Sequence, residues 1–78
     1  MNEKQQEMVQ RKIQKEARRY KVSEEDLVSA VSYLHYRNEN NHLEADIFKS
    51  LLPNHFNFEP AENVLQFVAD HVDGDFVV

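Results

Sequence analysis

The chain of 78 residues contains no cysteine, no tryptophan, one glycine and two prolines. The lack of cysteine excludes disulfide bonds, zinc–thiolate sites and thiol chemistry. It also fits a reducing compartment, so a cytoplasmic protein is expected. Phosphate-binding loops need several glycines at fixed spacings, and a single glycine cannot supply them. These absences remove the usual cross-links and cofactor loops of small proteins.

Long apolar runs are missing as well. No stretch approaches the roughly 18 apolar residues of a membrane-spanning helix, and the start of the chain, M-N-E-K-Q-Q-E, lacks the apolar core of a secretory signal. We therefore expect no membrane partner. A domain this small has a net stability of only about 3–5 kcal/mol from its core, which favours efficient helix packing and self-association. A homo-oligomer is the resulting prediction.

The net charge of −5 is distributed unevenly along the chain. Residues 1–21 contain seven Lys and Arg against three Glu, a balance of +4, and residues 22–78 contain two against eleven, a balance of −9. A basic segment joined to an acidic body can bind a polyanion, bind an acidic partner or fold against its own body. We predict a basic amphipathic helix at 1–21, extended or packed on a partner, and a compact acidic helical domain at 22–78.

Hydrophobic periodicity predicts an all-α fold, a small domain of four helices at about 5–21, 24–37, 43–52 and 60–73. Ser23 is the expected N-cap of the second helix, where Val22 and Leu27 occupy the positions of a hydrophobic staple. Asn41 is the expected cap of the third helix. Pro60 suits the first turn of the fourth.

The buried face of the second helix is expected to consist of Leu27, Val28, Ala30, Val31 and Leu34. The third helix has apolar residues around more than half of its circumference, so it is expected to be buried on most sides and central in the packing. These residues are Leu43, Ala45, Ile47, Phe48, Leu51 and Leu52.

Two short apolar segments are typical of extended structure. Phe56 and Phe58 alternate with polar neighbours, and the chain ends in three residues that favour strands. We expect either a minimal two-stranded pairing of residues 55–58 with 75–78 or a C-terminus packed into the core.

Aromatic residues on the outer side of the second helix suggest a protein interface. Tyr33 and Tyr36 lie outside the arc of the buried face and next to small serines, a surface composition enriched in interfaces. The chain's own first helix or a second copy is expected to cover them. The predicted partner-binding residues are Val9, Ile13, Tyr20, Tyr33 and Tyr36.

Catalytic and metal-binding patterns are not found in the sequence. The four histidines occur in neither H-x-x-x-H nor H-E-x-x-H spacing, and no nucleophile elbow is present. We predict no catalytic, cofactor-binding or metal-binding residues, and no enzyme. The leading prediction is a small cytoplasmic protein–protein interaction or regulatory module that self-associates.

The alternative is a nucleic-acid-binding regulator. The second and third helices have the outline of a helix-turn-helix, but the third carries Glu44 and Asp46 against Lys49, and an acidic helix is repelled by a duplex. The basic first helix can still contact phosphates. The residues that this alternative uses are Arg11, Lys15, Arg18 and Arg19.

Overall fold

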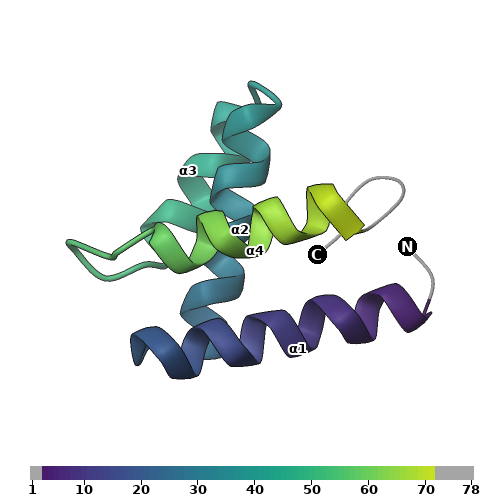
Figure 1. The fold of residues 1–78 in the computed structure, drawn as a ribbon. Coiled ribbons are helices and arrows are strands. Elements are labelled where there is room, and N and C mark those ends of the chain that lie inside the picture. Colours follow the sequence, from purple (N-terminus) through teal and green to yellow (C-terminus); the bar gives the residue numbers. More distant parts are fainter. Residues whose placement is uncertain (1–2, 72–78) are drawn as a thin grey trace.

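The computed structural model describes residues 3–71, which form four helices and no strand. The helices are α1 (Glu3–Tyr20), α2 (Glu24–Asn38), α3 (His42–Ser50) and α4 (Glu59–His71) (Figure 1). The predicted all-α domain of four helices is confirmed. Every helix end lies within two residues of its expected position.

The expected two-stranded pairing is not supported. Residues 55–58 lie in the loop between α3 and α4, and the segment 75–78 lies outside the described residues. In that loop, Phe56 and Phe58 are half-buried against the core, and their ring centroids are 5.4 Å apart. The alternating pattern therefore comes from a loop that packs two aromatic rings inward.

α2 is the central helix of the domain. α1, α3 and α4 each pack against it, and α1 also packs against α4 (Figure 1). Four of the five residues predicted for its inner face are buried and the fifth, Val28, is half-buried. Leu27, Ala30 and Val31 have no exposed surface at all. α2 thus contributes more buried side chains to the core than any other helix.

The remaining core side chains come from α1 and α4. Val9, Ile13 and Ala17 recur about one turn apart on α1 and are all buried. They share one core cluster with α2 and with three small side chains of α4, which are Ala61, Val64 and Val68. Small residues on α4 allow the neighbouring helices to approach closely. α1 therefore packs its apolar side on its own domain.

The local signals for the helix ends are confirmed. The Ser23 side-chain oxygen accepts a hydrogen bond from the Asp26 backbone N–H at 3.0 Å, and Asn41 Oδ1 accepts one from the Glu44 N–H at 3.4 Å. Pro60 lies buried in the first turn of α4. Such caps satisfy N–H groups that have no partner inside the helix.

The position expected for α3 is wrong. α3 contacts only α2 among the described helices, and Ala45 is its single buried residue. Leu43, Ile47 and Leu51 are 81%, 53% and 61% exposed. The physical reason is that α1 and α4 pack against α2 and against each other, and neither of them packs against α3. One face of α3 is consequently left outside the core.

The end of α1 generates a first prediction. Lys21 adopts the left-handed conformation (φ 57°), and the Val22 N–H donates to the Ala17 carbonyl at 3.0 Å, as at the end of a helix that is normally closed by glycine. A residue with a Cβ is disfavoured there. Lys21→Gly should therefore raise the free energy of unfolding by about 0.5–1 kcal/mol in urea titrations.

Asn40→Gly is the matched comparison, because Asn40 has a similar backbone angle (φ 62°) but asparagine tolerates this conformation. Asn40→Gly should raise the free energy of unfolding by less than Lys21→Gly does. A Lys21→Gly variant no more stable than the unmodified chain would contradict the assignment of strain to this position.

Candidate protein-interaction surface

A row of exposed apolar side chains runs along α3. Leu43, Ile47 and Leu51, here called the α3 stripe, are spaced four residues apart, so they lie on one side of the helix and its C-cap. These three are the large apolar side chains that are exposed in the described part of the chain. Single exposed apolar residues are ordinary, whereas a contiguous row marks an interaction surface.

The opposite face of α3 is attached to α2. Ala45 is buried there, and the Phe48 ring stacks on Tyr36 with centroids 5.6 Å apart and ring planes 9° apart. At 3.6 residues per turn, Ala45 lies about 160° around the helix from the centre of the α3 stripe. The contacts with α2 therefore direct the stripe away from the core.

Acidic side chains border the α3 stripe. Glu44 lies about 60° from its centre on one side, and Asp46 lies about 100° from it on the other. Both residues are exposed, and neither carboxylate has an ion pair within residues 3–71. Lys49 lies on the far side of α3, with its Nζ 6.0 Å from the centroid of the Tyr33 ring. Both borders of the stripe therefore carry negative charge.

The two tyrosines predicted to face a partner are half-buried inside the chain. Tyr33 packs against Phe58 with ring centroids 5.3 Å apart, and Tyr36 stacks on Phe48 as described above. The sequence suggested that α1 or a second copy covers them. The structure covers them with α3 and with the loop before α4, so their aromatic surface holds α3 in place.

The three predicted partner-binding residues of α1 also contact the chain's own domain. Val9 and Ile13 are 4% and 8% exposed within the core. Tyr20 is half-buried, and its hydroxyl accepts a hydrogen bond from Asn63 Nδ2 on α4 at 3.5 Å. Of the five residues, the tyrosines alone retain a partly exposed side chain.

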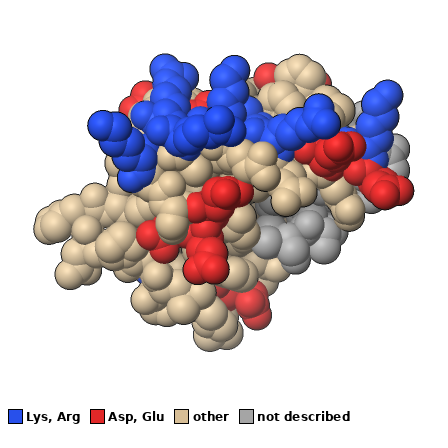
Figure 2. Space-filling model, turned by 90° about the horizontal axis from the view of Figure 1, so that it is seen from below, with Lys and Arg blue, Asp and Glu red and all other residues tan. Residues whose placement is uncertain are grey.

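Basic residues form a row on the outer side of α1. Arg11, Lys15, Arg18 and Arg19 are all exposed, and Figure 2 shows Lys and Arg side chains lined up along this helix. Within this row, Arg11 alone forms an ion pair, with Glu7 of the same helix at 3.0 Å. No ion pair in the described region joins the row to α2, α3 or α4. Within residues 3–71, the row is therefore not paired with the acidic side chains of the other helices.

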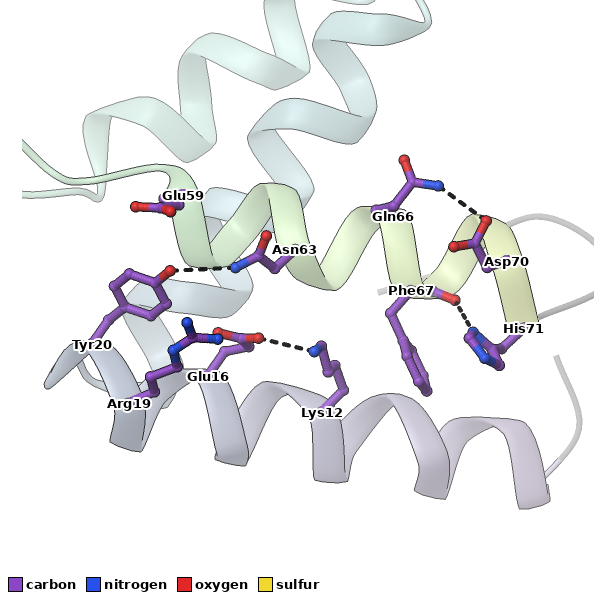
Figure 3. Close-up of a pocket in the computed structure, with 10 residues that line it drawn as sticks. All are labelled: Lys12, Glu16, Arg19, Tyr20, Glu59, Asn63, Gln66, Phe67, Asp70 and His71. Carbon is purple, nitrogen blue, oxygen red and sulfur yellow. Dashed lines mark hydrogen bonds and ion pairs between the residues drawn. The ribbon is translucent and has the colours of Figure 1, made fainter.

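A shallow groove of about 450 Å³ lies between α1 and α4 (Figure 3). The Glu16 side chain is 2% exposed in it, and its Oε1 accepts a hydrogen bond from Lys12 Nζ at 2.9 Å. The second oxygen, Oε2, is buried without a hydrogen-bond partner. Glu16 is thus a buried carboxylate held by one ammonium group, at the edge of an otherwise apolar helix face.

The described residues show neither a metal site nor a membrane span. No group of three or more His, Asp or Glu side chains in residues 3–71 is placed to hold a metal ion. Across the same range, every helix is too short or too polar to cross a bilayer.

The histidines lie on different elements of the chain. His71 stacks on Phe67 of its own helix with ring centroids 4.5 Å apart, and His42 and His55 are exposed.

Comparison with known proteins adds no relative: no family model, curated protein or solved structure matches the chain. The functional argument therefore depends on the surfaces described above. The α3 stripe was missed from sequence because its apolar residues were assigned to the core. The available signal was the spread of the apolar residues of segment 43–52 around more than half of the helix circumference, which is wider than one packed face.

Two ion pairs on α1 provide a prediction, because they have the same spacing and differ in burial. Lys12–Glu16 places a 2% exposed carboxylate against a 23% exposed ammonium, whereas Arg11–Glu7 is 75% and 62% exposed. Lys12→Ala leaves Glu16 buried without a partner, and should lower the free energy of unfolding by about 1–3 kcal/mol. Arg11→Ala should lower it by about 0.5 kcal/mol or less.

Chemical denaturation of both variants checks this difference. Equal losses for the two substitutions would show that Glu16 is solvated in solution despite its burial in the structure.

Proposed function

We propose that the protein is a small protein–protein interaction module whose docking surface is the α3 stripe. The observation that carries the proposal is that Leu43, Ile47 and Leu51 form a single exposed row on a helix that is fixed to α2 by its other face. Helices that dock through apolar anchors at a spacing of three or four residues are a recurrent mode of protein recognition.

The way in which α3 is held supports this proposal. Asn41 caps the helix, and the stacking of Phe48 on Tyr36 fixes its orientation on α2. A preformed helix loses little conformational freedom when a partner binds, and this preorganisation favours affinity. Self-association through the stripe and binding of a different protein are both compatible with this proposal.

Substitution of the central residue of the stripe tests the proposal. Ile47→Asp places a charge in the middle of the docking surface and should remove partner binding, because an unpaired buried charge opposes association. Ile47 is 53% exposed, so circular dichroism should show an unchanged helix content. The measurement is affinity capture from a lysate of the source cells, with mass spectrometry of the captured proteins.

Asn38→Asp is the matched control, because it introduces the same charge at an exposed position at the end of α2. Proteins captured by the unmodified chain and by Asn38→Asp, and lost with Ile47→Asp, would support α3 as the surface. An identical list of captured proteins for all three chains would contradict it.

A second candidate function, binding of nucleic acid, is favoured by one observation. The basic row of α1 is exposed (Figure 2), and no ion pair among residues 3–71 joins it to α2, α3 or α4. Arg11, Lys15 and Arg18 lie opposite the buried side of α1, and Arg19 lies on its flank beside the α1–α4 groove. A phosphate backbone can therefore approach the row without disturbing the core. Such binding would depend on charge and carry little sequence information.

Mobility shifts on a random duplex test this candidate. Affinity should fall steeply from low to physiological salt, and the double variant Lys15→Gln/Arg18→Gln should reduce the slope of log K against log salt by about 2, or about 1 for each lost phosphate contact. Lys49→Gln on α3 is the control and should leave the slope unchanged. The absence of a shift at micromolar protein would exclude the candidate.

A further inference from the structure

Charge around the α3 stripe restricts what can dock there. Glu44 and Asp46 lie on opposite borders of the stripe, are exposed, and form no ion pair in the described structure. Lys49 belongs to the opposite side of α3 and lies over the Tyr33 ring. A partner that covers the stripe therefore meets carboxylates on both sides of it and no ammonium group from α3.

We infer that the segment that docks on the α3 stripe is a basic amphipathic helix, with an apolar row bordered by Lys or Arg on both sides. The inference rests on the proposed function and names its partner. Opposite charges at the border of an interface accelerate association and exclude like-charged competitors, while the apolar row supplies the contact area. An acidic or neutral partner helix would place no positive charge next to the carboxylates of Glu44 and Asp46.

A second copy of the chain is a poorer occupant on the same grounds. Two chains that meet through their α3 stripes bring four carboxylates, Glu44 and Asp46 from each, to one interface, and each chain has a net charge of −5. Like charges placed together oppose association. The basic helix α1 of a second copy has its apolar side in its own core, where Val9 and Ile13 are buried. It has no free apolar row to offer.

The size of the stripe indicates a transient complex. From Leu43 to Leu51 the stripe extends about 12 Å along the helix, at 1.5 Å per residue. One partner helix laid along it gives an interface at the low end of the range for specific complexes, below about 1,200 Å².

Two synthetic probes test the inference. One is an amphipathic helical peptide with leucines four residues apart and lysines on both borders, and the other has glutamates in place of the lysines. Fluorescence anisotropy with the unmodified full chain gives both dissociation constants. The lysine probe should bind at least about tenfold more tightly than the glutamate probe at low salt, and the ratio should fall as salt rises.

A charge-reversed chain provides the decisive comparison. Glu44→Lys/Asp46→Lys should reverse the preference, so that the glutamate probe binds more tightly. Glu62→Lys/Asp70→Lys is the control, because it makes the same change in net charge at exposed positions on α4, a helix that does not contact α3. This control should keep the preference for the lysine probe.

The outcomes separate the inference from the function on which it depends. Equal binding of both probes, lost in Ile47→Asp, would overturn the inference and leave the α3 docking surface standing. A mass above the 9.2 kDa monomer in sedimentation equilibrium, restored to the monomer by Ile47→Asp, would identify a second copy as the occupant and also overturn the inference. No binding of either probe by a monomeric chain would overturn both proposals.

Discussion

Burial of α2 on three sides is the constraint on which the rest of the structure depends. Leu27, Ala30 and Val31 are completely buried, and they become so because α1, α3 and α4 all pack against this helix. α1 and α4 also contact each other and thereby cover their own apolar sides. α3 has α2 as its single neighbouring helix in the described structure. A helix with one neighbour can bury one face, so its remaining apolar residues stay at the surface.

The same constraint gives α1 two faces of different chemistry. Its apolar residues enter the core, whereas Arg11, Lys15 and Arg18 of its basic row lie on the opposite side of the helix and Arg19 lies on the flank beside the α1–α4 groove. Glu16 interrupts this separation, because its carboxylate is buried at the edge of the core face and is held by Lys12. Replacement of a buried ion pair by apolar residues often stabilises a protein, so the pair gives little evidence for stability. It fixes the position of one cation next to the α1–α4 groove.

The features that sequence could predict are those decided by neighbouring residues. The Ser23 and Asn41 caps, the buried side of α2 and the ends of the four helices follow from local hydrogen bonds and periodicity. The features that it could not predict depend on which helices meet. The apolar pattern of α3 is compatible with a central helix or with an exposed one, and the alternation around Phe58 fits a strand or a loop that packs inward. Only the three-dimensional arrangement distinguishes these possibilities. In that arrangement Tyr33 and Tyr36 pack on aromatic rings of the chain itself, whereas the α3 stripe is exposed, and the stripe is therefore the candidate site.

Within residues 3–71, no helix packs on the α3 stripe, so the described packing does not require it to be apolar. Glutamate and lysine form helices about as well as leucine and better than isoleucine, so polar residues at positions 43, 47 and 51 would keep α3 helical. The contacts with α2 come from Ala45 on the opposite face and from Phe48 on the flank of the helix. Full burial of one large apolar side chain contributes about 1.5–3 kcal/mol, and Leu43, Ile47 and Leu51 each keep more than half of their surface exposed after folding. Binding of the proposed partner helix would bury these side chains, and the carboxylates of Glu44 and Asp46 are the reason why that helix is proposed to be basic.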